Sequence, residues 1–509
     1  MRKWPFVVGG IGLLGALAFL PWFGARRTRG LHSVMPAPPP YVFPRDFLFG
    51  AATAGHQIER AQPSDWTAFE QEVMRTGRFG TLGTGRPKPG HIHDLGRWPD
   101  EVRRAKTNHD ALYAQDLALA AQMGHNAYRF SLEWARLFPK EQMEEADPQG
   151  VAYYHGLLDA MERAGLTPSA TLFHFASPQW LWQERGGRRG WERDDALRHF
   201  ERYLRAVAKH FGGRISHYCT LNEPMVYVYN GYLEGVFPPG ERRGDPSQVA
   251  GVVAQLLRAH ALAYRILKED ASRRGRSIAV GFTQHTRAFH PYRNWAPLDR
   301  LTASLIEQAF IWDFVDAVHT GTLRMTGTQQ RQEIPGLKGT QDYLGINYYG
   351  RFYVKTSILH PLRFEILMHD PDDPSEPRSD LGWAEYPRGL LEVLAEAQRR
   401  YQLPLYVLEN GVADAADDDR RRQRYLVAHL RELWLARQRG IDVRGYFHWS
   451  LIDNFEWAEG FGPRFGLIRV DYQDGFRRVP RPSADLYRRI IRTGITHEML
   501  QAVGLASDR

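Results

Sequence analysis

The sequence predicts an α/β fold, a single (β/α)8 or TIM barrel preceded by an N-terminal hydrophobic anchor helix. Short apolar runs rich in strand-forming residues alternate with amphipathic stretches, as is typical of a parallel sheet. Eight such runs occur, which is the number that closes a barrel, and polar residues follow the ends of most of them. The 509 residues, 43% of them hydrophobic and 24% charged, allow one large core, because α/β barrels often exceed the usual domain length.

The N-terminal segment is predicted to anchor the chain in a membrane. An apolar run covers residues 4–23, about long enough to cross a bilayer as a helix, and cationic residues flank it on both sides. These flanks favour an uncleaved anchor over residues 1–29 and leave the side of the membrane open. The alternative is a secretory signal cleaved near residues 16–18, which would make the mature protein secreted or periplasmic.

A proline-rich stretch follows the apolar run. Residues 35–40 contain four prolines, which predicts a short, stiff polyproline spacer. We place this linker over residues 30–44, the barrel domain over residues 45–495, and a C-terminal tail over residues 496–509.

Eight apolar runs are interpreted as the barrel strands. Amphipathic segments such as residues 111–123, 151–164 and 196–211 lie between them. A doubly wound open sheet is the structural alternative, but it usually has fewer strands, and no phosphate-binding glycine loop follows the first run. The predicted strands are residues 47–53, 127–134, 167–175, 217–223, 278–286, 342–349, 405–409 and 443–451.

Composition argues against several classes of protein. The formal net charge of +8 would suit nucleic acid or an anionic surface, but no nucleic-acid motif and no long basic block with interleaved aromatics occurs. An arginine-rich solvated surface therefore explains the charge. The single cysteine, Cys219, excludes an intrachain disulfide and lies in an apolar run, as a core residue does.

Two glutamates at the ends of predicted strands point to a reaction site. Glu223 and Glu409 each end an apolar run, where a carboxylate has no routine structural role. In a closed barrel the carboxyl ends of all strands meet at one mouth, so side chains from the fourth and seventh strands face each other. Hydrolysis of a glycosidic bond requires such a pair, with retention at a separation of about 5–5.5 Å and inversion at a wider one.

From about residue 43 to residue 487, the chain resembles glycoside hydrolase family 1, the family of β-glucosidases and β-galactosidases. The resemblance rests on several motifs in the right order, among them TLNEP at residues 220–224 and LENG at residues 408–411. It implies that Glu223 is the acid/base and Glu409 the nucleophile of a retaining mechanism. Leu408 is a mild departure, because the family more often has threonine there.

The resemblance also implies roles for supporting residues. Arg129, in the motif YRFS, corresponds to the arginine that contacts the nucleophile, and Tyr349, in GINYY, to the tyrosine that hydrogen-bonds it. Both would keep Glu409 ionised, whereas Glu223 must begin protonated, so their environments should push the two pKa values apart. The positions that bind the sugar correspond to Gln57, His174, Asn222 (at the 2-hydroxyl), Trp449, Glu456 and Trp457.

Glu456 bears on the identity of the sugar. Family members that act on 6-phosphosugars lack this carboxylate, and a carboxylate would repel a phosphate. The resemblance thus implies a β-linked substrate with an unphosphorylated glycone such as glucose, galactose or fucose. It implies no cofactor, because carboxylates carry out both steps. The aglycone, the choice between glucose and galactose, and the oligomeric state stay open.

Three polar stretches are interpreted as loops without metal. His91 and His93 lie two residues apart, without the spacing that would complete a tetrahedral site. Asp414 and residues 417–419 lack the spacing of an EF-hand, which favours a solvated loop. Residues 357–380, rich in proline and aspartate, predict a variable surface loop near the aglycone side.

Three functions fit these features. The first is hydrolysis of β-glucosides or β-galactosides. The second is glycosyl transfer from the same covalent intermediate to a lipid or sugar hydroxyl, since membrane-bound plant members of the family that remodel galactolipids share the layout of anchor and barrel. The third is a sugar-binding protein on an inactive barrel, but such family members typically lose one of the two carboxylates, and both are present here.

Overall fold

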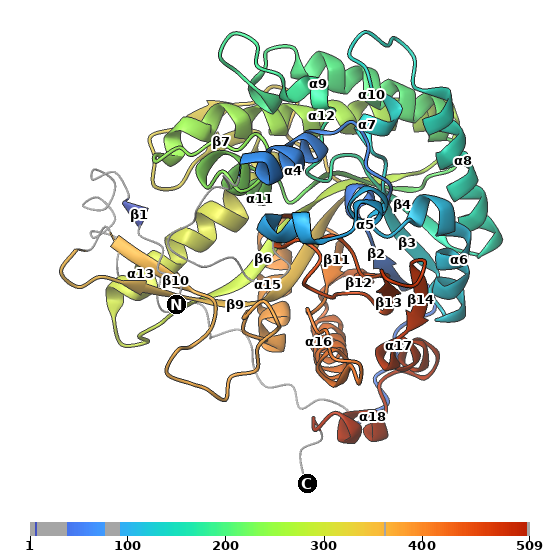
Figure 1. Ribbon diagram of the computed structural model, residues 1–509. Coiled ribbons are helices and arrows are strands. Elements are labelled where there is room, and N and C mark those ends of the chain that lie inside the picture. The colour runs from blue at the N-terminus through green and yellow to red at the C-terminus, as the bar shows by residue number, and fades with distance from the viewer. Residues whose placement is uncertain (1–5, 8–37, 77–91, 361–362, 506–509) are drawn as a thin grey trace.

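The structure is a computed structural model that describes residues 6–7, 38–76, 92–360 and 363–505 (Figure 1). Eight parallel strands close into a barrel, because β12 pairs with β2 and β6 pairs with β9 in addition to the other neighbour pairings. In barrel order the strands are β2 (Leu48–Ala52), β3 (Ala127–Ser131), β4 (Thr167–Thr171), β5 (His217–Asn222), β6 (Ala279–Pro291), β9 (Tyr343–Thr356), β11 (Leu405–Asn410) and β12 (Val443–Trp449).

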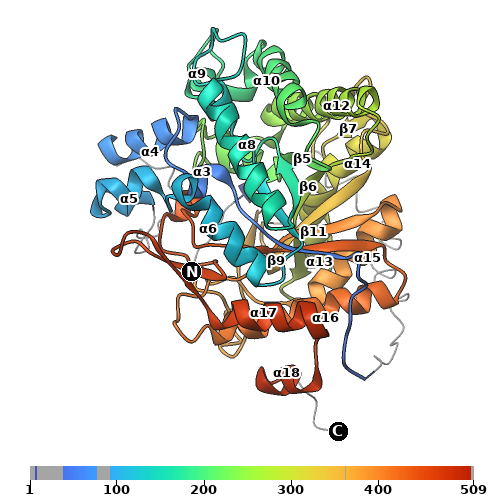
Figure 2. The same ribbon diagram turned by 90° about the vertical axis from the view of Figure 1, so that its right-hand side faces the viewer.

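A long helix follows each strand and covers the outside of the barrel, as Figures 1 and 2 show. This arrangement buries the strands on both faces, which is why they read as nearly continuous apolar runs. The covering helices are α6 (His109–Gln122), α8 (Pro148–Arg163), α10 (Ala196–Phe211), α12 (Ala250–Arg273), α14 (Asp313–Thr320), α15 (Pro387–Tyr401), α16 (Arg420–Gln438) and α17 (Pro482–Thr493).

Further helices lie in the loops at the barrel ends. They are α3 (Gly55–Ile58), α4 (Asp65–Thr76), η2 (Ile92–Arg97), α5 (Asp100–Ala105), α7 (Trp134–Leu137), α9 (Gln179–Trp182), η3 (Gly190–Glu192), α11 (Pro224–Val228), η4 (Tyr229–Leu233), η5 (Pro246–Val249), α13 (Pro297–Glu307), η6 (Gln308–Trp312), η7 (Trp457–Glu459) and α18 (His497–Ala502). Two small hairpins, β7 (Thr322–Arg324) with β8 (Arg331–Glu333) and β13 (Ile468–Asp471) with β14 (Arg477–Pro480), complete the fold.

All eight predicted strands are confirmed, with differences at their ends. β6 and β9 run past the barrel mouth, where they stay paired as far as Pro291 and Val354. The prediction of a loop over residues 357–380 is partly wrong, because this segment contains β10 (Arg363–Leu367), which pairs antiparallel to β9. The free edge of the lengthened β9 explains this extra strand, since unpaired backbone groups at an edge recruit a partner.

The N-terminal prediction falls mostly outside the described residues. Of the apolar run over residues 4–23, only Phe6 and Val7 are described, and there the predicted helix is wrong: they form β1, antiparallel to β10. Within the described parts of the chain, no helix is both long enough and apolar enough to cross a membrane. At the other end, the segment predicted as a tail contains α18, which buries Met499 and Leu500.

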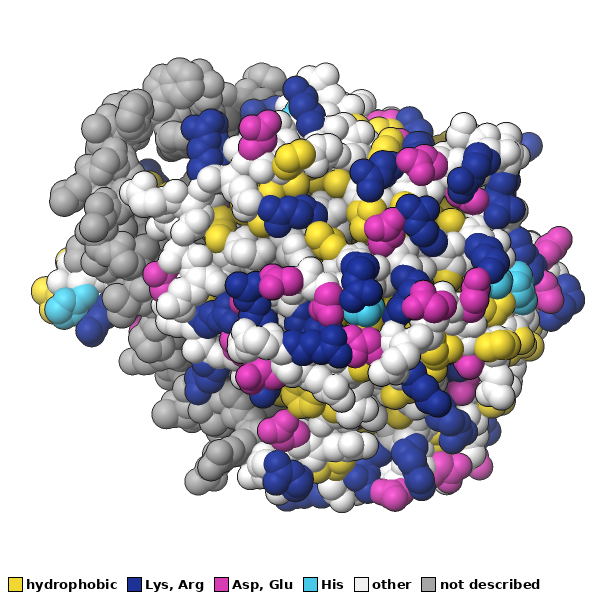
Figure 3. Space-filling view, turned by 90° about the horizontal axis from the view of Figure 1, so that it is seen from above, with side chains coloured by type: hydrophobic (Ala, Val, Ile, Leu, Met, Phe, Trp, Pro, Cys, Tyr) yellow, Lys and Arg dark blue, Asp and Glu magenta, His cyan; other side chains and the backbone are white. Residues whose placement is uncertain are grey.

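The surface agrees with the interpretation of the positive charge. On the face seen in Figure 3, basic and acidic side chains are intermixed, with hydrophobic side chains scattered among them. Many arginines are paired on the surface, as Arg205 is with Glu201 and Arg399 with Glu396. Such a surface is solvated rather than organised as one basic patch.

Candidate active site

Glu409 lies near the carboxyl end of β11 and is held by two donors. Arg129 Nη1, from β3, contacts Glu409 Oε1 at 2.6 Å, and the Tyr349 hydroxyl, from β9, donates to Oε2 at 2.6 Å. Arg129 is fully buried and is itself fixed by Thr171 Oγ1 at 3.1 Å. Three strands distant in sequence thus place a cation and a hydroxyl on the two oxygens of one carboxylate.

Glu223 follows β5 directly and is turned into the mouth by the local backbone. Its φ is +44°, in the left-handed region, and Pro224 begins α11 immediately afterwards. Its amide donates to the carbonyl of Thr283 at 3.0 Å, which ties the turn to β6. The NEP part of the motif therefore ends the strand, turns the chain and starts a helix within three residues.

The Glu223 carboxyl group has two neighbours that donate to Oε1. Asn347 Nδ2, from β9, donates at 2.8 Å, and His285 Nδ1, from β6, lies 3.0 Å away. The sequence argument did not single out His285. Its signal was the continuous polar run over residues 283–287 at the end of an apolar strand, in which every second side chain lies on the same face.

Asn222 connects the two carboxylates. Its Oδ1 accepts hydrogen bonds from Arg129 Nη2 at 2.7 Å, Thr283 Oγ1 at 2.8 Å and Asn347 Nδ2 at 3.2 Å. Its Nδ2 donates to His174 Nε2 at 3.0 Å. The amide is thereby fixed between the residues that contact Glu409 and those that contact Glu223.

The pKa values of the two glutamates are pushed apart, but in the opposite sense to the prediction. Burial raises the pKa of Glu409 to about 7; Arg129 and Tyr349 oppose this effect and the charge of Glu223 adds to it. Burial also acts upward on the pKa of Glu223, but a charged His285 and the hydrogen bonds from His285 and Asn347 outweigh it and lower the pKa. The position of the proton between the two glutamates therefore depends on the charge of His285.

The predicted sugar-binding residues gather beside Glu409. Gln57 Nε2 donates to the carbonyl of Phe455 at 2.8 Å and to Glu456 Oε2 at 3.3 Å. The His174 ring stacks on Trp457 with 5.9 Å between centroids and lies at the same distance from Trp449. The structure thus brings together the polar and aromatic groups that the resemblance assigned to one sugar.

Several polar atoms in this region are free to meet a ligand. Among the described residues, the buried atoms Gln57 Oε1 and His174 Nδ1 have no hydrogen-bond partner. Burial, together with the charge of Arg129, lowers the pKa of His174, so the ring is neutral and Nδ1 carries its hydrogen. One free acceptor and one free donor therefore stand next to aromatic rings, an arrangement that suits a sugar with several hydroxyls.

A buried charged network supports this region from behind and was not predicted. The His56 ring stacks on Trp457 with 5.7 Å between centroids and 10° between planes. His56 Nε2 lies 2.8 Å from Glu70 Oε1, and Lys106 Nζ lies 2.6 Å from Glu70 Oε2. The network fixes the orientation of His56 and, through it, of the tryptophan.

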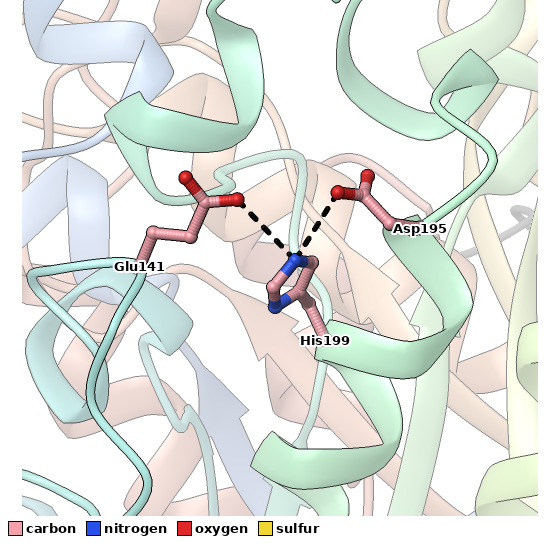
Figure 4. A group of neighbouring side chains, drawn as sticks. All are labelled: Glu141, Asp195 and His199. Atoms are coloured by element: carbon pink, nitrogen blue, oxygen red, sulfur yellow. Dashed lines mark ion pairs between the residues drawn. The ribbon is translucent and has the colours of Figure 1, made fainter.

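One group in the described part of the chain has the spacing of a metal site, but arginine occupies it. Oxygen and nitrogen atoms of Glu141, Asp195 and His199 lie within 4.8 Å of one another (Figure 4). Arg193 Nη2 contacts Glu141 at 2.9 Å and Asp195 at 2.7 Å, and Arg185 also pairs with both carboxylates. Two guanidinium groups already neutralise the carboxylates that a cation would need.

The loop predictions have different outcomes. His91 lies outside the described residues, as does the side chain of His93. The prediction of a solvated loop around Asp414 is partly wrong, because Asp414 and Asp419 are buried. Arg422 donates to the Asp414 carbonyl at 2.6 Å and pairs with the Asp419 carboxylate. Residues 417 and 418 are exposed, as predicted.

The closed barrel and a pair of buried glutamates at its mouth define a glycosidase of the α/β-barrel class. The chain belongs to glycosyl hydrolase family 1, whose family model matches residues 40–495. It is therefore a glycoside hydrolase, and the resemblance seen in the sequence is confirmed.

Proteins named as β-glycosidases are similar to this chain over most of its length. Beta-glucosidase 13 of Arabidopsis thaliana is 33% identical over 499 residues, covering 88% of this chain and 92% of its own. A beta-galactosidase of Sulfolobus acidocaldarius is 30% identical, covering 90% and 96%. Among solved structures, a beta-glycosidase from Pyrococcus horikoshii is similar with a TM-score of 0.78 at 37% identity, covering 92% of this chain and 99% of that one.

Proposed function

We propose that the protein hydrolyses β-glucosides or β-galactosides with retention of configuration, using Glu409 as nucleophile and Glu223 as acid/base. The observation that carries this proposal is the pairing of Glu409 with Arg129 and Tyr349 at the barrel mouth, with a second buried glutamate in the same pocket. The two groups interact electrostatically, as paired catalytic carboxyl groups do.

The reaction proceeds in two displacements. Glu409 attacks the anomeric carbon while Glu223 gives its proton to the glycosidic oxygen, so the aglycone leaves as an alcohol and a glycosyl ester forms. A water molecule then attacks the same carbon as Glu223 removes its proton, and the ester bond to Glu409 breaks. Two inversions at one carbon give net retention.

The glycone is proposed to be unphosphorylated. Asn454 Nδ2 donates a hydrogen bond to Glu456 Oε2 at 2.7 Å, and Gln57 Nε2 donates to the same oxygen. Burial raises the pKa of Glu456 to about 8, so the carboxyl group is suited to exchange hydrogen bonds with hydroxyls, and in its ionised form it would repel a phosphate. The name of the Arabidopsis relative favours glucose, and that of the Sulfolobus relative favours galactose.

The deciding experiment uses Glu409→Gly with an activated aryl β-glucoside. We expect activity to fall by at least about 10⁴-fold, because no covalent intermediate forms, and azide to restore turnover with a glycosyl azide of inverted configuration as product. Product NMR of the unaltered enzyme should show retention. Unchanged activity in this variant, or an inverted product from the unaltered enzyme, would refute the proposal.

Glycosyl transfer at a membrane is the second candidate. Three large side chains close to the turn between β9 and β10 are exposed, Trp295 by 72%, Ile358 by 66% and Leu359 by 85%, and β1 of the apolar N-terminal run pairs with β10. An apolar surface next to an apolar segment suits contact with lipid. If a glycolipid in vesicles captures most of the sugar from an aryl donor, transfer replaces hydrolysis as the main reaction; free sugar as the main product excludes it.

A further inference from the structure

His285 is fixed on three sides at the edge of the site. Its Nδ1 lies 3.0 Å from Glu223 Oε1, and Arg287 Nε donates to its Nε2 at 3.1 Å. The ring stacks on Tyr349 with 5.7 Å between centroids and 18° between planes, and Phe310 meets it edge-on at 5.9 Å. The imidazole therefore bridges a buried arginine and the proposed acid/base.

The arginine determines which nitrogen of His285 carries the hydrogen. A guanidinium group has only donors, so Nε2 must accept the hydrogen bond from Arg287 and holds no hydrogen of its own. Nδ1 then carries the single hydrogen of the neutral ring and donates it to Glu223 Oε1. Protonation of Nε2 would require this contact with Arg287 to break.

Arg287 is itself an unusual cation. It is 3% exposed, and its guanidinium lies over the rings of Phe352 at 4.2 Å and Trp383 at 4.3 Å. Among the described residues it forms no ion pair, and its Nη1 has no hydrogen-bond partner. Burial lowers the pKa of Arg287 to about 10, so the group still carries its charge at neutral pH.

A buried positive charge beside His285 opposes a second positive charge on the ring. The titratable groups that face His285 are Glu223 from the end of β5, Arg287 from β6 and Tyr349 from β9. The phenol of Tyr349 stays neutral, because burial and then the charge of Glu409 raise its pKa. Tyr348 and Tyr425 lie on the side of Arg287.

From these contacts we infer that Arg287 and His285 are positioning residues that keep the proton of the His285–Glu223 pair on Glu223. This inference rests on the proposed function of Glu223. In the first step the proton moves from Glu223 to the glycosidic oxygen, and in the second step a proton of water returns to Glu223. His285 keeps its one hydrogen on Nδ1 throughout and donates to whichever charge state Glu223 has.

A neutral His285 also bears on the order of the pKa values of the two glutamates. The lowering of the pKa of Glu223 depends first on a charged His285. With a neutral ring that contribution is lost; burial still raises the pKa of Glu223, and the hydrogen bonds from His285 and Asn347 and the charge of Arg129 still lower it. The proton then belongs on Glu223, and Glu409 keeps its charge beside Arg129, as the first displacement requires.

The first test compares pH profiles of Arg287→Met, His285→Asn and the double variant. For Arg287→Met we expect the basic limb of kcat/KM to move to lower pH, because an imidazolium forms beside Glu223 and lowers its pKa, so the proton leaves Glu223 at lower pH. The loss should be about tenfold or more for alkyl β-glucosides, whose leaving group needs protonation, and small for 2,4-dinitrophenyl β-glucoside, whose leaving group does not. In the His285→Asn background, Arg287→Met should shift nothing further, because asparagine donates but does not titrate.

Arg351→Met is the matched control. Arg351 also lies over two aromatic rings, those of Tyr353 at 4.6 Å and Tyr386 at 4.4 Å, but pairs with Glu376 and does not contact His285. Arg351→Met should leave the basic limb in place. An unmoved limb in Arg287→Met, equal losses for both leaving groups, or the same shift in the His285→Asn background would overturn the inference.

The second test needs no altered arginine. In ¹⁵N NMR of the full-length protein at neutral pH, the ring of His285, assigned by its loss in His285→Asn, should show a protonated Nδ1 and an unprotonated Nε2. An imidazolium, or a hydrogen on Nε2, would contradict the inference. Because this readout is independent of turnover, it still decides the question if the proposed function fails, and that failure would itself appear as no release of aryl group by the unaltered enzyme.

Discussion

At the scale of single residues, the site is governed by which donors reach which carboxyl oxygen. Glu409 has a permanent cation on one oxygen and a phenol on the other. Glu223 has an amide and an imidazole on the same oxygen, Oε1. The two glutamates are thereby suited to different tasks. A fixed positive charge keeps a nucleophile ionised, while neutral donors allow an acid/base to release and regain its proton.

Removal of the Tyr349 hydroxyl tests the first of these environments. In Tyr349→Phe, Glu409 loses a hydrogen bond that favours its ionised form, so its pKa rises and the acidic limb of the pH profile moves upward. We expect kcat/KM to fall about 10- to 100-fold, as for a lost hydrogen bond to a charged group. Tyr343→Phe, deeper in the barrel with its hydroxyl on the Tyr218 carbonyl, serves as control and should keep the acidic limb. An unmoved limb in Tyr349→Phe would count against the assignment of Glu409.

Glu456 links the sugar site to the stability of the fold. Burial raises its pKa to about 8, whereas the unfolded chain has an ordinary value of about 4.3. Between these pH values the folded state holds a proton that the unfolded state has released, so this group's contribution to the free energy of unfolding falls as pH rises. Glu456→Gln cannot lose that proton and should gain stability relative to the parent between pH 5 and pH 8, while kcat/KM falls at least about tenfold.

Thermal unfolding of both proteins across this pH range measures the effect. The melting temperature of Glu456→Gln minus that of the parent should become more positive toward pH 8. A constant difference would show that Glu456 titrates alike in the folded and unfolded states. Aryl β-glucoside kinetics on the same samples separate the change in stability from the loss of sugar contacts.

At the scale of elements, loops after different strands support one another. Lys106 lies just after α5, Glu70 lies in α4, and His56 lies in α3, which connects the network to Trp457 of η7. Lys106 Nζ also lies 3.8 Å from the centre of the Phe455 ring. The loops that follow β2 and β12 are thus joined by this buried network in addition to the hydrogen bond from the Phe455 amide to the Gln57 carbonyl at 3.0 Å.

Removal of the buried ammonium group of Lys106 should lower the stability of the fold at the contact between these two loops. In Lys106→Met, Glu70 keeps His56 as its one partner among the described residues, and breaking a buried ion pair costs about 3–5 kcal/mol of stability. Urea unfolding should show most of this loss, and Glu70→Gln combined with Lys106→Met should recover part of it, because no unpaired charge remains. If the double variant is as unstable as the single one, packing around Lys106 rather than charge explains the effect.

At the scale of the whole molecule, the barrel is closed independently of the first 37 residues. Tyr41 joins the N-terminal end of the described domain to its C-terminal end, with its amide donating to the Ile495 carbonyl at 3.0 Å and its ring 4.6 Å from that of Trp434. The family match begins at residue 40, close to this point. The segment before it contributes only β1, two residues long, to the described structure.

A chain beginning at Pro38 therefore tests the division between anchor and barrel. We expect its melting temperature and its activity on soluble aryl β-glucosides to match those of the full chain, because the contacts of Tyr41 are retained. The full chain should sediment with membranes and the shortened chain should not, as proposed for an anchor over residues 1–29. Equal amounts of both chains in the soluble fraction would refute the anchor.

The sequence by itself determined the fold class, the eight strands and the identity of the two glutamates. It did so because strands buried on both faces must be apolar along their length, and because a carboxylate at the end of such a strand needs a reason to be there. The resemblance to glycoside hydrolase family 1 also implied roles for Arg129, Tyr349 and the sugar-binding residues. These signals lie in short stretches of sequence, so they can be recognised without knowledge of the tertiary contacts.

Only the tertiary structure decided how those residues are partnered. The contacts of His285 with Glu223 and with Arg287, the network of Lys106, and the pairing of Asp419 with Arg422 depend on side-chain direction and burial. The order of the two pKa values depends on them too, because a pKa responds to every charge within a few ångströms, whatever its distance in sequence. The end of a strand determines where a glutamate lies, and its neighbours from other strands determine its charge state and therefore its role in a reaction.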